Sequence, residues 1–388
     1  MSDLPCLLQW VENFLPGSFQ IQSVGQGGNE QCLSLNALNG DAGFRQYFRL
    51  NTEPPLIAVS APPEHENTLA FVEISLCFQH ANIRTPKIYA VDYQRGFLLL
   101  EDFGDQLLLP KLFSGRLFSE GALSGRGLSN GQLSAQVSSN TADSLYQTVE
   151  TELLKIQQIK TDGSIFPYYD HQLLLDEMAL FPQWFVEQLL GIELQDTDRA
   201  ILDKTFSLLA KNAEDQPQVV VHRDFHARNL MLLPDNGMGV IDFQDAVIGP
   251  FTYDMVSLFR DCYIRWPVDV VVQHVLDYAK RAEGLGIIPK VSDEQMMRWF
   301  DLMGLQRHIK VLGIFARLWL RDSKPNYLDD LPLVIRYTLE QLSLYPDLKP
   351  FKHWFEQRVL PELPQQSWYQ PWETAGDSFD QSARNSDG

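Results

Sequence analysis

Residues 219–246 read VVVHRDFHARNLMLLPDNGMGVIDFQDA, a stretch in which polar and charged side chains are crowded between apolar runs. The runs at 219–221 and 238–241 predict two short strands, and the polar sequence at 234–237 predicts a turn. Asn229 follows Asp224 by five positions, and Asp242 follows Asn229 by thirteen. Three polar side chains therefore stand at fixed places in a loop and just after the next strand.

Three interpretations of this stretch are open: a metal site of the His-x-Asp-x-His kind, a phosphate-transfer loop, and a polar turn. Transfer of a phosphoryl group from ATP needs a carboxylate to accept the hydroxyl proton and two oxygen ligands for Mg²⁺. Asp224 fits the first role, and Asn229 and Asp242 fit the second. A metal site made of His222, Asp224 and His226 would leave Asn229 and Asp242 without roles. We therefore favour phosphoryl transfer, with His222 bracing the loop.

The bulk composition bounds the class of protein. The chain has 388 residues, of which 45% are hydrophobic and 21% are charged, as in ordinary globular proteins with room for two substantial cores. Its net charge of −19 disfavours nucleic acid and anionic membranes as partners. The four cysteines lack C-x-x-C spacing, no leader opens the chain, and apolar runs are too short to span a membrane. We expect a cytoplasmic monomer.

The residue pattern changes along the chain from strand-rich to helical. The patterns of the first part predict a helix at 67–79 and strands at 44–50, 56–59, 88–92 and 96–100. Helical periodicity dominates beyond residue 144, and Ser292 with Gln295 predicts a capping box. We expect a small N-terminal lobe at residues 1–101 and a larger C-terminal lobe at 102–362.

Two segments have the composition of non-globular chain. Residues 113–141 contain five-residue blocks such as FSGRL and LSNGQ, in which an apolar residue precedes serine. Five blocks are too few to stack into a solenoid, so we expect a flexible insertion. Residues 374–388 are polar and predict a disordered tail.

The motifs HRDFHARNLM and GVIDFQDAVIGPFTYDMVSLFRDCY resemble those of the aminoglycoside phosphotransferase and choline kinase superfamily. The resemblance implies an α+β, protein-kinase-like bilobal fold with a small β-rich N-lobe and a larger helical C-lobe. The segments GDAGFRQYFRL, LIAVSAPPEHE, GFLLLEDFGD and WFDLMGLQRHIKVLGIFARL extend the likeness over about residues 40–331. They resemble the bacterial kinases that phosphorylate N-acetylmuramate and N-acetylglucosamine at the anomeric C1 hydroxyl, in cell-wall sugar recycling.

The resemblance implies ATP and Mg²⁺ as cofactors and an amino sugar as the small-molecule substrate. It makes Asp224 the catalytic base and makes Asn229 and Asp242 the Mg²⁺ ligands. It also places nucleotide contacts in a turn and in the strand that enters the adenine hinge: Gly40, Asp41, Ala42, Gly43, Arg45, Glu101 and Asp102. The branch usually has serine where this chain has Gly43, so backbone N–H groups would have to replace a hydroxyl contact to phosphate.

One cationic group of protein kinases is missing. Residues 56–61 read LIAVSA and lack the strand lysine that pairs with nucleotide phosphates. Arg45 is the candidate for the missing charge, although it could equally be a solvated strand arginine. Its partner could be Glu64, Glu66 or Glu73, and the sequence does not choose among them.

The acceptor candidates are polar residues that interrupt apolar helices, namely Arg260, Asp261, Arg307 and His308. An arginine could bind the lactyl carboxylate of muramate through two hydrogen bonds, but each of these residues could instead belong to an internal ion pair. Two rival functions stay open. One is a kinase of the same fold for an aminoglycoside, choline or homoserine, and the other is a non-catalytic pseudokinase, which the missing lysine suggests.

Overall fold

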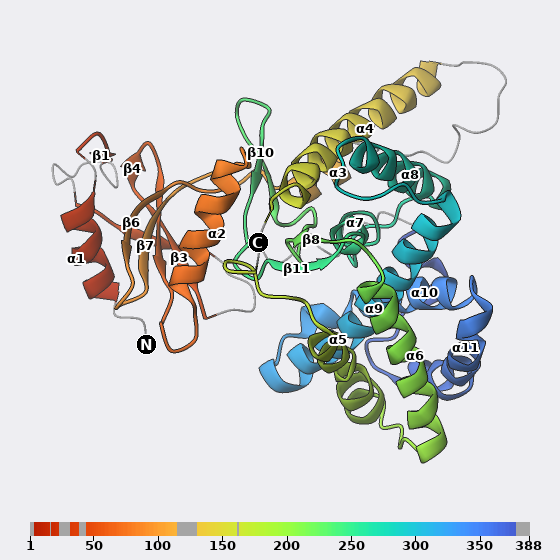
Figure 1. Cartoon of the computed structure of the whole chain (residues 1–388). Helices are drawn as coiled ribbons and strands as arrows, with labels where there is room; N and C mark the ends of the chain where they lie inside the picture. The colour runs from red at the N-terminus through yellow and green to blue at the C-terminus, as the bar shows by residue number, and fades with distance from the viewer. Residues whose placement is uncertain are drawn as a thin grey trace. The chain divides into compact units, whose positions relative to one another are not determined.

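The computed structural model describes residues 4–15, 17–22, 32–38, 44–114, 130–160 and 163–377, with the side chains of 113–143 left out. The chain divides into two compact units (Figure 1). Unit 1 contains the chain up to Lys155 together with Ala227–Asp245. Unit 2 contains Ile156–His226 and the described chain from Ala246 onward.

Unit 1 is built on a five-stranded antiparallel sheet. Its strands, in spatial order, are β2 (Leu35–Ala37), β3 (Gln46–Leu50), β5 (Leu56–Ser60), β7 (Phe97–Glu101) and β6 (Ile88–Asp92). The central strand β5 is buried at every position, which explains its unbroken apolar sequence. Gly96 permits the tight approach of β7 to Ala61, because a Cβ there would lie 1.8 Å from the Ala61 carbonyl oxygen.

Two helices pack in this part of unit 1: α1 (Leu4–Phe14) and α2 (Thr68–His80). Trp10 of α1 is buried in the hydrophobic core with residues of the sheet. The helix α2 begins after Asn67, whose side chain accepts a hydrogen bond from the Ala70 N–H at 3.0 Å. The predicted helix at 67–79 and the four predicted strands are confirmed.

The remaining elements of unit 1 include a hairpin in the polar stretch, in which the predicted strand at 238–241 pairs with a strand at 230–232 that was not predicted. They are β1 (Gln20–Ile21), β4 (Thr52–Glu53), α3 (Leu108–Ser114), α4 (Asn130–Gln157), β9 (Leu230–Leu232) and β10 (Met238–Val240), of which α4 extends two residues into unit 2. The antiparallel pair β9 and β10 is joined by the expected turn, in which Asn236 has a φ of 62°. Of the predicted insertion, residues 115–129 lie outside the described part. Residues 130–141 are helical and form the first part of α4, which continues without a break beyond residue 144, so the predicted insertion does not extend over them.

Unit 2 is helical around one buried helix, α9 (Asp293–Asp322). The other helices are α5 (His171–Met178), η1 (Phe181–Leu189), α6 (Asp196–Glu214), α7 (Tyr253–Phe259), α8 (Val268–Gly284), η2 (Pro325–Leu328), α10 (Leu331–Leu342), η3 (Pro346–Leu348), α11 (Lys349–Trp354), η4 (Phe355–Val359), η5 (Leu360–Gln365) and η6 (Trp372–Thr374). One antiparallel pair, β8 (Gln218–Val221) and β11 (Val247–Pro250), completes the unit.

The start and the packing of α9 follow from its sequence. Ser292 accepts a hydrogen bond from the Gln295 N–H at 3.2 Å, as the capping pattern predicted. Gly313 allows the start of η1 to lie against α9, since a Cβ there would stand 2.4 Å from the Leu180 carbonyl carbon. The middle of the helix is buried on several sides, so its polar residues there face protein: Asp301, Gln306, Arg307, His308 and Lys310.

The last described residues of the chain are bound to α10. Arg336 donates hydrogen bonds to the Ala375 carbonyl and the Asp377 carboxylate at 2.8 and 2.7 Å. The first described residues of the predicted tail are therefore held in place, and residues 378–388 lie outside the description. Across the described helices, none is both long and apolar enough to cross a lipid bilayer.

Candidate functional site

The loop that follows β8 carries the residues of the HRD motif in unit 2. Arg223 has a φ of 76°, a left-handed conformation that is uncommon for arginine and needs external support. His222 is fully buried, and its Nδ1 accepts a hydrogen bond from the Asp224 N–H at 3.3 Å. His222 therefore makes the predicted bracing contact to the backbone of Asp224.

Asp254 of α7 holds the backbone of this loop. Its carboxylate accepts hydrogen bonds from the backbone N–H groups of His222 at 2.7 Å and Arg223 at 3.0 Å. Complete burial raises the pKa of Asp254 to about 7, although the two N–H donors favour the ionised form. The sequence had not indicated this residue. Its one signal was an aspartate inside the apolar stretch FTYDMVSLF.

Asp224 is the half-exposed carboxylate of the loop, with 46% of its side chain accessible. Burial raises the pKa of this carboxyl, but Arg307, His226, Lys310 and His222 together outweigh burial and lower the pKa to about 2. Asp224 is therefore ionised at neutral pH and can accept a hydrogen bond from a hydroxyl group.

Glu177 of α5 is a second residue that the sequence did not reveal. One of its oxygens, Oε1, lies 2.5 Å from Arg223 Nη2 and 2.9 Å from Lys310 Nζ. The other oxygen accepts a hydrogen bond from the Tyr169 hydroxyl. Burial raises the pKa of Glu177, but Lys310 and Arg223 more than compensate, so the pKa is below its usual value. One carboxylate thus binds two cations, Arg223 and the buried Lys310.

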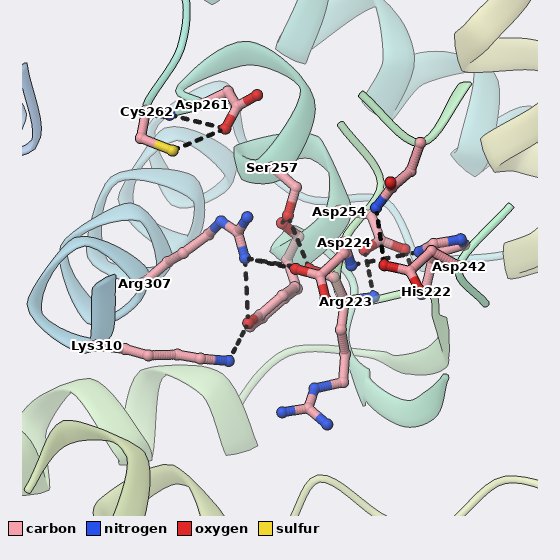
Figure 2. A network of polar contacts seen from close by, with 12 residues as sticks. His222, Arg223, Asp224, Asp242, Asp254, Ser257, Asp261, Cys262, Arg307 and Lys310 are labelled. Atoms are coloured by element: carbon pink, nitrogen blue, oxygen red, sulfur yellow. Dashed lines mark hydrogen bonds and ion pairs between the residues drawn. The ribbon is translucent and has the colours of Figure 1, made fainter. Parts of the chain in front are cut away.

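Two cations of α9 point toward the loop that carries the HRD motif (Figure 2). Arg307 donates from Nη1 to the Arg223 carbonyl at 3.1 Å and to the Tyr253 hydroxyl at 3.4 Å. The same Nη1 lies 3.9 Å from Asp224 Oδ1. Lys310 donates to the Tyr253 hydroxyl at 3.1 Å. The sequence had indicated Arg307 but not its neighbour Lys310.

The other acceptor candidates make internal contacts. Arg260 pairs with Asp301 at 2.7 Å and lies over the Phe300 ring. His308 lies between the Gln341 side chain and the Arg260 carbonyl, each at 3.0 Å, and burial lowers its pKa to about 4.

Asp261 is also buried, and its Oδ1 accepts from the Cys262 N–H at 2.7 Å. Of the four candidates, Arg307 is therefore the residue that these contacts join to the loop that carries Asp224.

In unit 1, the hairpin brings Asn229 beside Asp242. Asn229 directly precedes β9, Asp242 follows β10 by two residues, and the Ile241 N–H donates to the Asn229 carbonyl at 3.1 Å. Asn229 Nδ2 lies 3.3 Å from Asp242 Oδ2, while the Gln244 amide donates to Asp242 Oδ1 at 2.7 Å. Neighbouring amide and carboxylate oxygens are suitable ligands for Mg²⁺, so this pair fits the predicted metal.

The alternative metal site does not form. Among the residues that the structure describes, there is no group of three or more His, Cys, Asp and Glu side chains arranged to hold a metal ion. His222, Asp224 and His226 all belong to the described part of the chain.

On the predicted nucleotide side, Gly40, Asp41, Ala42 and Gly43 lie outside the described residues. Arg45 is described, and only 6% of its side chain is exposed. Its Nη2 lies 2.8 Å from Glu66 Oε2, and its guanidinium stacks 5.0 Å above the Phe71 ring. Arg45 is therefore not a solvated arginine, and Glu66 is its partner, whereas Glu64 and Glu73 are exposed.

Glu101, the last residue of β7, and Asp102, which follows it, bind groups of unit 1. Glu101 accepts from the Lys87 N–H at 3.2 Å. Asp102 binds Arg49 through two hydrogen bonds of 2.5 and 3.1 Å and also accepts from the Gly104 N–H at 2.8 Å. These side chains fix the segment after β7, which leaves its backbone groups as the candidates for contact with adenine.

Solved structures show which fold these elements form. The Plasmodium vivax ethanolamine kinase has a TM-score of 0.55 and 13% identity, with 79% of this chain and 82% of that chain covered. The aminoglycoside phosphotransferase APH(2'')-Ib, with ADP bound, has a TM-score of 0.51 and 14% identity, with 79% and 94% covered. LicA in complex with AMP has a TM-score of 0.54 and 12% identity, with 88% and 100% covered. The predicted α+β, protein-kinase-like fold is confirmed.

Relatives found by sequence are more similar to this chain than these solved structures are. The N-acetylmuramate/N-acetylglucosamine kinase of Pseudomonas putida is 39% identical over 343 residues, which cover 88% of this chain and 92% of the relative. Relatives of the same name in Pseudomonas aeruginosa and Neisseria meningitidis are 36% and 35% identical, over 87% and 83% of this chain and 92% and 89% of their own lengths. The model of the phosphotransferase enzyme family matches residues 34–286. This chain therefore belongs to the phosphotransferase enzyme family and is a phosphotransferase that acts on an alcohol acceptor.

Proposed function

We propose that this protein uses ATP to phosphorylate the anomeric C1 hydroxyl of N-acetylmuramate, N-acetylglucosamine or both. The observation that carries the proposal is the ionised Asp224, held in a braced loop five positions before Asn229. The relatives named N-acetylmuramate/N-acetylglucosamine kinase support the substrate class. The ADP and AMP in two structures of the same fold support ATP as the phosphoryl donor.

In the proposed reaction, Asp224 accepts a hydrogen bond from the C1 hydroxyl and directs its oxygen at the γ-phosphorus. The sugar O–P bond forms as the bond between that phosphorus and the bridging oxygen of ADP breaks, and the hydroxyl proton passes to Asp224. A carboxylate with a pKa of about 2 is a weak base. An anomeric hydroxyl is unusually acidic for an alcohol because the ring oxygen withdraws charge, so a weak base placed at the correct distance suffices.

Asn229 and Asp242 would hold Mg²⁺ through their side-chain oxygens. When bound there, the ion would neutralise charge on the phosphate oxygens during transfer. Gln244 steadies the Asp242 carboxylate by donating to Oδ1. The backbone after Glu101 and Asp102 would bind adenine, and the turn at residues 40–43 would cover the phosphates, a role that rests on the resemblance alone.

We also propose that the protein acts as a cytoplasmic monomer in the recycling of cell-wall sugars. Its charge of −19 disfavours nucleic acid and anionic membrane surfaces as partners. The product, a sugar 1-phosphate, is a substrate for a nucleotidyltransferase reaction that yields a nucleotide sugar.

The test is a panel of alcohols incubated with ATP and Mg²⁺. The panel contains the two amino sugars, their C1 methyl glycosides, choline, ethanolamine, homoserine and kanamycin. We expect ADP release with the free sugars and a ³¹P signal coupled to the anomeric proton. Methyl glycosides should be inert because their C1 oxygen carries no proton. Phosphorylation of the methyl glycosides would refute transfer to C1, and transfer to choline or kanamycin with neither sugar accepted would refute the substrate class.

The variant Asp224→Asn identifies the residue that takes the proton. It should bind Mg²⁺ and ATP as tightly as the unaltered protein, because the change lies at the acceptor hydroxyl. Turnover should fall by at least about 100-fold, the usual effect of removing a general base. Undiminished phosphorylation in this variant would show that another group performs the step.

A further inference from the structure

Arg307 and Lys310 are an unusual pair for a buried helix. They are three residues apart on α9, so both side chains leave the same face, and both residues are buried, with 6% and 8% of their surfaces exposed. Figure 2 shows both extending from α9 toward the catalytic loop. A buried cation is costly unless it has a partner, so each of the two needs a physical reason for its position.

Lys310 has such a partner, since it binds Glu177 at 2.9 Å and the Tyr253 hydroxyl at 3.1 Å. Arg307 is held differently. Its two hydrogen bonds go to uncharged oxygens, the Arg223 carbonyl and the Tyr253 hydroxyl. The Asp224 carboxylate lies 3.9 Å away, within reach of its charge but beyond hydrogen-bond distance.

The hydrogen bond to Arg223 falls at the strained point of the loop. Arg223 has the left-handed φ of 76°, and its N–H is already taken by Asp254 at 3.0 Å. Arg307 and, at 3.3 Å, the Ser257 hydroxyl of α7 both donate to the carbonyl of the same residue, so both sides of the strained residue are held from outside the loop. The next residue along the chain is Asp224, whose direction depends on that backbone.

The exposure of the side chains separates two roles for Arg307. Direct binding of an acceptor carboxylate to Arg307 would need the guanidinium to become accessible when the acceptor arrives. The side chain of Arg307 is only 8% exposed, whereas that of Asp224 is 46% exposed. Asp224 is therefore accessible to an acceptor while Arg307 lies behind it.

We propose that Arg307 is a positioning residue, which sets the direction and charge of Asp224 through the loop and does not bind the acceptor. Lys310 and Glu177 support it by fixing the Tyr253 hydroxyl and the Arg223 side chain. This inference rests on the proposed role of Asp224. It differs from the expectation that an arginine of this helix recognises the lactyl carboxylate of muramate.

The charge of Arg307 predicts a change in pH dependence. The charged and titratable groups that face Asp224 are Arg307 and Lys310 from α9, His222 and His226 from the loop, Arg223 beside it, and Asp254 from α7. Arg307 is the strongest of the groups that lower the pKa of Asp224. Without Arg307, the effect of burial on the pKa of Asp224 is less well compensated, so Asp224 should become protonated at a higher pH. The acid limb of the pH profile, which is the range in which kcat falls as the pH is lowered, should therefore move to higher pH.

The experiment compares Arg307→Met and Arg307→Lys with Arg321→Met, a matched control at an exposed arginine of the same helix that pairs with Asp322. Turnover of both amino sugars is measured from pH 2 to 8, a range that includes the pKa of about 2 of Asp224 and its expected rise, and folding is checked by thermal unfolding at each pH. We expect Arg307→Met to lower kcat roughly 100-fold and to a similar extent for both acceptors, with the KM for ATP unchanged. Its acid limb should rise by roughly one pH unit or more.

The lysine variant separates charge from hydrogen bonding. Arg307→Lys keeps the positive charge but has no planar fork to span the Arg223 carbonyl and the Tyr253 hydroxyl. It should therefore retain the acid limb of the unaltered protein and regain only part of kcat. Arg321→Met should match the unaltered protein in every measurement. If the methionine variant does not fold, the lysine variant tests the proposal by itself: it should lower kcat for both sugars and leave the acid limb of the pH profile where it is in the unaltered protein.

Three results would overturn the inference. A loss confined to N-acetylmuramate would show that Arg307 binds the acceptor carboxylate. A lower kcat with an unmoved acid limb in the methionine variant would indicate a structural role alone, and full activity in that variant would exclude any role. If the unaltered protein accepts neither sugar, the proposed function fails, and the same comparison is made with the alcohol that it does accept.

Discussion

Replacing Glu177 with glutamine removes one negative charge while keeping the shape of the side chain. The carboxylate is 10% exposed and binds Arg223 and Lys310 through the same oxygen, at 2.5 and 2.9 Å. Its other oxygen accepts from the Tyr169 hydroxyl. An amide has one oxygen in place of two, so at least one of these donors must lose its acceptor in the variant.

The size of the effect follows from the number of cations that share the carboxylate. Removing one partner of a buried ion pair costs about 3–5 kcal/mol, because the other charge is left buried and uncompensated. Since two cations depend on Glu177, we expect Glu177→Gln to lower the free energy of unfolding by about 4–5 kcal/mol. Lys310→Met leaves the Arg223 pair intact and should cost less. The double variant should cost less than the two single changes together, because the methionine removes one of the stranded charges.

Urea unfolding followed by tryptophan fluorescence measures this loss. Seven of the eight tryptophans belong to unit 2, so the signal reports mainly on the unit that contains Glu177. Because the folded protein holds the pKa of Glu177 below its usual value, the carboxylate stabilises the fold above its unfolded pKa, and this contribution is lost as the pH falls through the folded pKa. The difference between the two proteins should therefore narrow in acid. A loss below about 1 kcal/mol at pH 7 would refute the reasoning, since it is the range of an exposed ion pair.

Two further predictions concern other parts of the chain. Arg45→Met should raise the KM for ATP roughly tenfold or more, as expected for loss of a charge-assisted hydrogen bond to phosphate, while Arg95→Met, at an exposed arginine of unit 1, should not. An unchanged KM for ATP would exclude Arg45 as the substitute for the strand lysine. His308 has a folded pKa of about 4 and an unfolded value near 6.5, so its stabilising contribution is present above pH 6.5 and falls by about 3 kcal/mol as the pH drops to 4. His308→Gln should flatten this loss in a series of urea unfolding curves, and an unaltered slope would show that His308 is not buried as a neutral ring.

The resemblances and the local patterns predicted much of the fold. The strands and the helix of unit 1 were predicted because alternating and helical periodicities follow directly from which faces are buried. The spacing of Asn229 and Asp242 was informative because a tight turn at 234–237 returns the chain onto itself, and a hairpin aligns residues that are close in sequence. Such features depend on neighbours within about fifteen residues, which a sequence displays.

The sequence by itself determined the chemistry of the motif, and the tertiary structure decided which distant groups serve it. Glu177, Asp254 and Lys310 lie 47, 30 and 86 positions from Asp224, and nothing in their local patterns sets them apart from other charges in apolar helices. Arg307 and Arg260 looked alike for the same reason, yet one contacts the Arg223 carbonyl and the other pairs with Asp301. The physical reason is that a charge in the protein interior must find a partner in space. The partner is set by how helices pack, and α9, buried on several sides, shows no polar face that would reveal where each of its cations points.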